Sequence, residues 1–260
     1  MRTALWKTRM VAVWAIGVAL ATSTVMGQAF PPGGSLPDAA SIVARHVEAV
    51  GGAEAYRRVQ AIHARGRLEL PAQGIVAAIE LFTVRPNRML YRVTVPGVGR
   101  IENGYDGAIG WTVNPISGPE LLEGRQLEEA AEDAWFDGPL HSSDRIRELT
   151  TVARMTFDGR DAWQVRVVFR TGREQMEYFD VETGLQIGSE SERATPQGIV
   201  PTINILRDYQ RFGELLQATT FVQRAMGFEQ TVTLSSCTYD DVPADTFTPP
   251  PAIAALVPAR

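Results

Sequence analysis

Residues 163–185, which read WQVRVVFRTGREQMEYFDVETGL, hold the pattern that decides the predicted fold. The first seven positions alternate in polarity: Trp163, Val165, Val167 and Phe169 alternate with Gln164, Arg166 and Val168. A period of two residues is typical of a strand with one face less exposed to water. Thr171-Gly172 and Glu182-Thr183-Gly184 then mark two tight turns. Because short turns join antiparallel neighbours, this stretch predicts an antiparallel meander.

The same rhythm of strand and turn extends outward from Ala61 to Tyr239. Before the quoted stretch it predicts strands over 62–70, 75–84, 89–95 and 108–113, separated by turn dipeptides such as Asn103-Gly104 and Asp106-Gly107. A second series begins near Leu149 and continues through the segments 185–193, 199–212, 217–224 and 228–239. We find no repeat at a fixed period. The pattern predicts one curved antiparallel sheet.

Helices are predicted at two places. Ser35 and Asp38 form a capping-box pattern before an amphipathic segment that ends at Gly51-Gly52, and residues 53–59 follow as a short second helix. A central helix is predicted to begin at Ser117-Gly118-Pro119-Glu120, with a kink or break at Gly124. Its apolar side carries Leu127, Ala130, Ala131, Ala134 and Trp135, and its acidic side, interpreted as a solvated face, carries Glu128, Glu129, Glu132 and Asp133. Residues 136–147 are predicted as a loop with a helical turn.

These elements place the chain in the α+β class with mainly antiparallel β structure. We expect a curved, unclosed half-barrel of about ten to eleven strands, with helices covering its concave face. Residues 30–248 would form one domain, and the Pro- and Ala-rich residues 249–260 a loose tail.

The first 29 residues have the features of a secretory signal peptide. Arg2, Lys7 and Arg9 precede an uncharged segment over 11–26, and Gly27-Gln28-Ala29 supplies small residues for cleavage. A membrane anchor is the alternative, but the uncharged segment is shorter than the roughly 20 residues that span a bilayer. The sequence therefore predicts export, with the periplasm as the expected compartment and secretion as the other destination.

The charge of the chain limits its partners. Its net charge is −5, and loss of the signal peptide would make it more negative by three. An acidic protein without a basic patch is a poor binder of nucleic acid and is repelled by anionic lipid. Transient membrane contact through a neutral apolar rim stays open. Cys237 is the only cysteine, so no internal disulfide can form, and we expect a monomer.

Few residues suit catalysis or metal binding. The three histidines, His46, His63 and His141, lack ligand-like spacing, and neither a CxxC motif nor a nucleophile elbow, phosphate-binding loop or dinucleotide fingerprint occurs. His46 is interpreted as a partly exposed helix residue and His63 as a strand residue. The sequence predicts no enzymatic activity, no cofactor and no metal. A hydrolase using His63, His141 or Asp106 remains the least favoured alternative.

Large apolar side chains are the more informative signal. Each one alone is best explained as ordinary core. As a set they can line a concave surface that is too wide for one layer of side chains to fill, so we predict that they line a hydrophobic ligand cavity: Phe82, Met89, Tyr91, Trp111, Trp135, Phe136, Trp163, Phe169, Met176 and Tyr178.

Four stretches resemble known proteins. Tyr178–Leu185 resembles a hairpin of the outer-membrane lipoprotein-sorting proteins and their relatives, the LolA/LolB-like family. Residues 103–111 followed by 118–121, residues 196–201 and residues 241–247 are similar to segments of an exported subgroup of that family. The resemblance implies an unclosed half-barrel with helices lodged in its concave side. It matches no position here to the functional arginine or the retention segment of the true sorting proteins.

The favoured function is therefore non-enzymatic binding or carriage of a lipid, a lipoprotein acyl chain or another apolar ligand in the periplasm. The expected partners are an apolar ligand or a lipidated protein. The alternative is an exported protein-interaction module with a filled core and no ligand.

Overall fold

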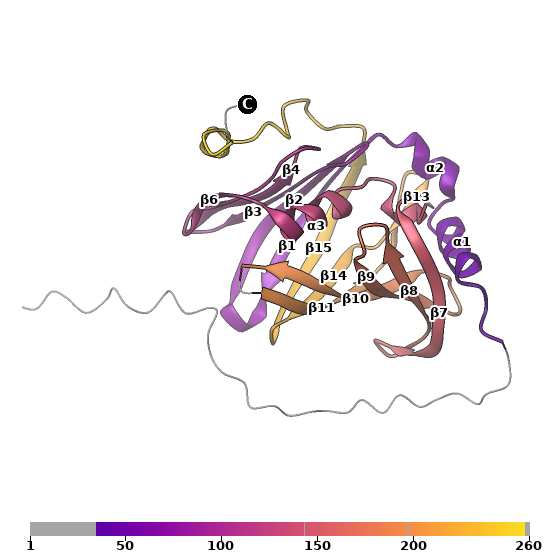
Figure 1. Cartoon of the computed structure of the whole chain (residues 1–260). Coiled ribbons are helices and arrows are strands. Elements are labelled where there is room, and N and C mark those ends of the chain that lie inside the picture. The colour runs from indigo at the N-terminus through magenta and orange to yellow at the C-terminus, as the bar shows by residue number, and fades with distance from the viewer. Residues whose placement is uncertain (1–34, 143, 197, 258–260) are drawn as a thin grey trace, which may run out of the picture.

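The computed structural model describes residues 35–142, 144–196 and 198–257. Thirteen antiparallel strands form one sheet that does not close on itself, in the order β6-β5-β4-β3-β2-β1-β15-β14-β11-β10-β9-β8-β7 (Figure 1). The strands of this sheet are β1 (Ala61–Leu70), β2 (Ile75–Val84), β3 (Arg88–Val95), β4 (Gly99–Tyr105), β5 (Gly110–Asn114), β6 (Gly118–Leu121), β7 (Ile146–Phe157), β8 (Arg160–Phe169), β9 (Glu174–Asp180), β10 (Gln186–Thr195), β11 (Gly198–Arg207), β14 (Thr220–Ala225) and β15 (Phe228–Tyr239). The predicted mainly antiparallel, unclosed sheet is confirmed.

The sheet has more strands than the ten to eleven predicted. Residues 199–212 were predicted as one strand, but they divide into β11 and the short β12 (Gln210–Phe212), which pairs with β13 (Leu215–Gln217) in a separate hairpin. Residues 118–121 were predicted to open the central helix and instead form β6, with Pro119 paired to Val113. Because β6 is an edge strand, Pro119 costs the sheet no inner hydrogen bond. The capping-box pattern at Ser117 was therefore misleading.

The helices are α1 (Ala39–Ala49), α2 (Ala53–Arg58), α3 (Gly124–Asp133) and α4 (Pro251–Ala254), with one-turn 3₁₀ helices η1 (Pro71–Gln73) and η2 (Gly138–Leu140). The N-cap of α1 is Asp38, whose carboxylate accepts a hydrogen bond from the Ser41 amide at 3.1 Å. The prediction that Ser35 is the N-cap residue of this helix was therefore wrong. The predicted signal peptide lies outside the described residues. In the described part of the chain, none of the helices has the length and apolar character needed to cross a bilayer.

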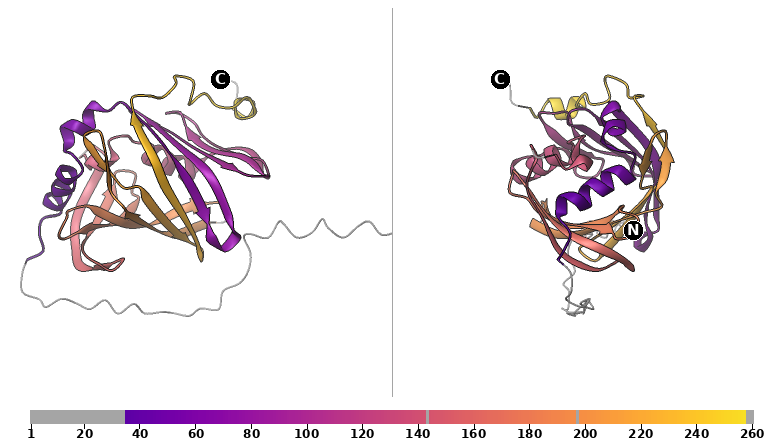
Figure 2. Two further views of the ribbon diagram at one scale, coloured as in Figure 1. Left: turned by 180° about the vertical axis from the view of Figure 1, so that it is seen from behind. Right: turned by 90° about the vertical axis from the view of Figure 1, so that its right-hand side faces the viewer.

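Three helices pack on one face of the sheet, here called the inner face. Helix α1 packs through Ile42, Val43 and Val47 against Val165, Val167 and Phe179 of β8 and β9. Helix α2 packs with Leu215 and Ile62, and α3 lies across β5 and β10. Figure 2 shows the sheet curving around the side on which α1 and α3 lie.

The opposite, outer face is covered over β2–β5 by the C-terminal segment. Phe247 and Ile253 of this segment are buried against Phe82, Leu90 and Trp111. Residues 251–254 thus form a packed helical turn within the stretch predicted to be a loose tail. The indole of Trp111 lies directly over Gly104, where a Cβ atom would be only 2.3 Å from the ring, so the glycine is required by close packing.

Strands β1 and β15 join the two halves of the sheet. Their pairing runs from Ile62↔Tyr239 to Glu69↔Thr231 and contains a bulge next to Gly66. A Cβ atom on Gly66 would lie 2.1 Å from the carbonyl oxygen of Thr233. The two backbones can approach this closely only because residue 66 has no side chain.

Candidate functional site

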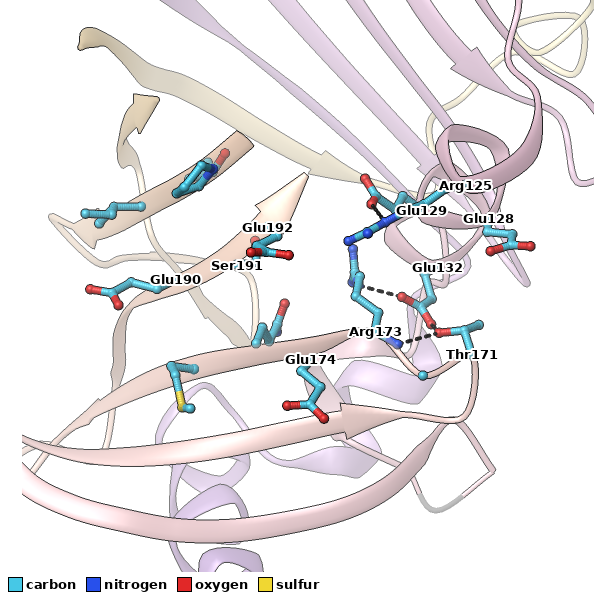
Figure 3. A pocket seen from close by; sticks show the side chains of 16 residues that line it. Arg125, Glu128, Glu129, Glu132, Thr171, Arg173, Glu174, Glu190, Ser191 and Glu192 are labelled. Atoms are coloured by element: carbon cyan, nitrogen blue, oxygen red, sulfur yellow. Dashed lines mark hydrogen bonds and ion pairs between the residues drawn. The ribbon is translucent and has the colours of Figure 1, made fainter. Parts of the chain in front are cut away.

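A large cleft lies where two hairpins of the sheet separate. Strands β9 and β10 pair from Gln186↔Phe179 only as far as Ser191↔Gln175. Beyond that point β10 continues with β11, while the chain at Arg173 turns back into β8. Helix α3 lies over the resulting fork, and the cleft beneath it has a volume of about 800 Å³ (Figure 3). This volume falls in the range of small-molecule sites, roughly 300–1,000 Å³.

The lining of this cleft is more charged than the sequence predicted. Its apolar members are Met176, Pro201 and Ile203. Its charged members come from α3 and from the ends of β9 and β10: Arg125, Glu128, Glu129, Glu132, Arg173, Glu174, Glu190 and Glu192. Carboxylates outnumber guanidinium groups, so the cleft favours a ligand that combines an apolar part with a positively charged group.

Ion pairs hold α3 against the fork. Arg173 contacts Glu132 at 2.6 Å and Asp133 at 2.9 Å, and Arg193 of β10 contacts Asp133 and, at 3.5 Å, Glu129. Figure 3 shows Glu129 and Glu132 on α3 beside Arg173 below. We call these five residues the α3 ion-pair cluster. It fastens the helix to β10 and to the β8–β9 turn.

The acidic side of α3 is only partly the solvated face that the sequence predicted, because Glu128 and Asp133 are exposed whereas Glu129 and Glu132 are not. Glu129 is the buried residue of this helix, and its carboxylate accepts the Ala194 amide at 3.0 Å and pairs with Arg125 at 2.9 Å. The side chain of Glu132 is only 5 % exposed. A helix held mainly by ion pairs buries little apolar surface, so less hydrophobic free energy opposes its movement.

A second, smaller cleft of about 230 Å³ lies on the other side of α3. Met89, Tyr91 and Tyr105 of β3 and β4 line it, together with Ala130 and Asp133 of α3. Helix α3 therefore borders both openings.

The structure does not gather the ten predicted lining residues at one site. Met176 borders the large cleft, and Met89 and Tyr91 border the small one. Trp163 and Phe169 pack beneath α1, whereas Tyr178, paired with Gln164, lies on the opposite face and stacks on Phe157. The other four lie elsewhere: Phe82 and Trp111 under the C-terminal segment, Trp135 beneath Arg145, and Phe136 against Tyr56 and Arg85.

A buried cluster of two histidines and a glutamate lies on the inner face beneath α1. His141 Nε2 and Glu177 Oε2 are 2.6 Å apart, and both side chains are almost fully buried. His141 Nδ1 lies 3.1 Å from the carbonyl oxygen of Pro139, and Gln175 donates to Glu177. His46 of α1, predicted as partly exposed, is buried against Phe179, and its Nδ1 accepts the Gln186 amide at 3.1 Å.

The pKa values of the three residues in this cluster are shifted in different directions. Burial and the charge of His141 lower the pKa of His46 to about 4. Burial alone would lower the pKa of His141, but the charge and hydrogen bond of Glu177 raise it. Burial alone would raise the pKa of Glu177, and the paired His141 lowers it. The geometry describes a neutral His46 beside a buried His141–Glu177 ion pair. No group of three or more His, Cys, Asp or Glu side chains in the described residues is arranged to hold a metal ion.

The lowered pKa of His46 predicts how the free energy of unfolding changes in acid. Because its folded pKa lies below its usual 6.5, the unfolded state binds a proton first, and stability falls as pH drops from 6.5 towards 4. His46→Asn keeps an acceptor near the Gln186 amide and cannot be protonated. We expect the wild type to lose about 2 kcal/mol more than this variant between pH 7 and pH 4.5, measured by urea unfolding. Parallel curves for the two proteins would contradict the assignment.

Three solved structures share this architecture. A domain named for outer membrane lipoprotein sorting, from Vibrio parahaemolyticus, is 13 % identical with a TM-score of 0.52, and the match covers 81 % of this chain and 96 % of that one. A LolA superfamily protein from Nitrosomonas europaea is 12 % identical with a TM-score of 0.52, covering 82 % and 99 %. A DUF1329 family protein from Desulfovibrio piger is 12 % identical with a TM-score of 0.53, covering 80 % and 95 %.

The sequence itself matches no protein-family model and no curated protein. Identities this low show the fold alone. The structural likenesses establish that this chain has the fold of the LolA superfamily and of lipoprotein-sorting domains.

Proposed function

We propose that this protein is a non-enzymatic periplasmic carrier that binds a lipid or a lipoprotein acyl chain in the cleft beneath α3. The observation that supports this most is a cleft of about 800 Å³ on the open side of a LolA-like sheet, closed by one helix. In this proposal the sheet acts as a half-barrel, and the helices on its concave side act as its cover. The expected partners are an amphipathic ligand or a lipidated protein.

The lining suggests how such a ligand would lie. Met176, Pro201 and Ile203 offer apolar contacts for an alkyl chain, and they line the cleft from the face of the sheet that carries Tyr178. Glu128 and Glu192 also line the cleft and form no ion pair with another described residue, so they are suited to an ammonium headgroup. The ligand we favour is therefore a lipid with a cationic or zwitterionic amine headgroup. Of the residues predicted from the sequence, Met176 belongs to this site, and Met89 and Tyr91 to its extension beyond α3.

The test is direct. The full chain is expressed so that the cell processes its own N-terminus, and the purified protein is extracted and examined by mass spectrometry for bound lipid. It is then delipidated and titrated with a fluorescent phosphatidylethanolamine. We expect saturable binding at one site. If the protein neither co-purifies with lipid nor binds added lipid, the carrier proposal is wrong. The protein-interaction module, which needs no cleft, would then be the remaining function.

Arg193→Ala tests whether α3 covers the ligand. Without Arg193, Asp133 still pairs with Arg173, and Glu129 still has Arg125 and the Ala194 amide. The variant thus loosens α3 from β10 without leaving a carboxylate unpaired. We expect the dissociation rate of the fluorescent lipid to rise about tenfold, the equivalent of about 1.4 kcal/mol.

The matched control is Arg58→Ala, which removes the exposed Arg58–Glu214 pair between α2 and the residue before β13. Its dissociation rate should equal that of the wild type. Unchanged release from the Arg193 variant would show that α3 does not retain the ligand.

A further inference from the structure

Six hairpin turns are brought to the same end of the sheet by the directions of its strands. Strand β1 ends where β2 begins, and the alternation of antiparallel neighbours carries this end across the sheet in both directions. The sixth, residues 170–173, carries Arg170 and Arg173 and is fastened to α3 by the Arg173–Glu132 ion pair. The other five are residues 71–74, 96–98, 115–117 and 226–227 and the turn that contains Pro196. In Figure 1 these ends of the strands point to the side opposite α1 and α2, and the reversed view in Figure 2 agrees. We call these five turns and the residues flanking them the turn rim.

Exposed large apolar side chains concentrate on the turn rim. Six of the twelve in the described chain lie there: Val76, Val98, Ile116, Ile199, Met226 and Phe228. Each of these five turns carries at least one of them or has one within three residues, and Ile116, in the turn between β5 and β6, is 78 % exposed. Single exposed apolar residues need no explanation, but half of them at one end of a molecule do.

These five turns carry no charge in the described residues, in contrast to the sixth, which carries Arg170 and Arg173. Four of them read PAQG, PGV, PIS and MG, and the fifth contains Pro196. Directly behind the MG turn, Glu229 is neutralised by Arg224 at 2.7 Å. Hairpin tips are commonly polar, so five uncharged tips in one row indicate a surface that meets an apolar medium.

We propose that the turn rim docks on a lipid bilayer, with its apolar side chains inserted at the level of the headgroups and upper acyl chains. Separate protruding tips suit insertion between lipids better than contact with a protein, which requires a continuous complementary surface. The net charge of −5 disfavours anionic membranes. The target is therefore a zwitterionic bilayer surface.

Docking in this way would bring the cleft close to the membrane. Ile199 of the turn rim lies two residues before Pro201, which lines the cleft, on the same strand β11. A ligand could then pass between bilayer and cleft over a short distance. Ligand transfer between bilayer and cleft rests on the carrier function proposed above, whereas docking of the turn rim on a bilayer does not.

The experiment is flotation of the full-length, cell-processed protein with phosphatidylcholine vesicles. The rim variant combines Ile116→Ser with Met226→Ser. The control combines Leu36→Ser with Val152→Ser, two exposed apolar residues that lie on the segment before α1 and on β7. All four positions are at the surface, so both variants should fold, which circular dichroism checks. We expect the rim variant to reduce the vesicle-bound fraction about tenfold or more, and high salt to leave wild-type binding unchanged.

Loss of flotation in the rim variant alone would support the proposal. Failure of the wild type to float, equal loss in the control, or undiminished flotation of the rim variant would each overturn it, and capture of a protein by the rim in place of vesicles would do the same. Lipid uptake is measured separately by mass spectrometry, so failure of the carrier function remains distinguishable from failure of docking.

Discussion

Replacing His141 with alanine is expected to lower the free energy of unfolding by about 3–5 kcal/mol near pH 6. The reason is the buried Glu177, which has His141 as its charged partner at 2.6 Å. Without the imidazole the carboxylate keeps only the amide of Gln175. A buried charge without its partner costs far more than the pair contributed. Urea unfolding monitored by tryptophan fluorescence measures the loss.

The pH dependence of this loss follows from the two pKa shifts. The pKa of Glu177 is lowered, so its contribution to stability is present above its usual 4.5 and is lost as pH falls through the folded value. The pKa of His141 is raised, so its contribution is present below 6.5 and is lost as pH rises through the folded value. The difference between wild type and His141→Ala should therefore be largest between these values and shrink in acid, where Glu177 is protonated.

A double-mutant cycle separates the ion pair from the backbone. His141 has a φ of 49°, in the left-handed region, so alanine there carries its own conformational cost. That cost is present equally in His141→Ala and in His141→Ala combined with Glu177→Gln. If the double variant is no more stable than His141→Ala alone, the buried charge is not the source of the effect.

Gly66→Ala is expected to destabilise the protein by about 3 kcal/mol or more. The new methyl group would lie 2.1 Å from the Thr233 carbonyl oxygen and 2.8 Å from the Leu234 Cα atom. Both are backbone atoms of the neighbouring strand, so no side-chain rotation can relieve the overlap. The β1–β15 ladder must open locally, and this ladder joins the two halves of the sheet.

Gly138→Ala is the matched control for this substitution. Gly138 lies in η2, its φ is not positive, and no atom lies within 4 Å of the Cβ position. Its midpoint of thermal unfolding should stay within a few degrees of the wild type, because a free surface position changes stability by about 0.5 kcal/mol at most. A midpoint for Gly66→Ala as high as this control would show that β1 and β15 tolerate a wider spacing.

Local alternation in the sequence predicted most of the sheet, because a strand exposed on one face must repeat every two residues. It was insufficient where a short segment could satisfy two patterns. Residues 117–120 have the spacing of a capping box, yet pairing with β5 decides their conformation. The number of strands was predicted incorrectly for a related reason. Strands β12 and β13 have three residues each, which is too short for a periodic pattern in the sequence.

The candidate site was harder to predict, because alternation gives two faces without saying which one is concave. Trp163 and Tyr178 have equivalent patterns in the sequence, and only the pairing of Gln164 with Tyr178 places them on opposite faces. The α3 ion-pair cluster depends on contacts 40 and 60 residues apart along the chain. An acidic helix stripe looks solvated until Arg173 and Arg193 are known to face it. The burial of His46 was missed for the same reason, because the residues that bury it are more than 130 positions away along the chain.

The pairing of β1 with β15 has a consequence for how the chain matures. Ile62 and Tyr239 are direct neighbours in the ladder although nearly the whole domain separates them in sequence. During synthesis the early hairpins can form one after another, but the central seam must wait until the last strand has emerged. Until then β1 presents an unpaired edge. We therefore expect nascent chains that lack residues 228–239 to require a chaperone, and the completed chain to be released from it.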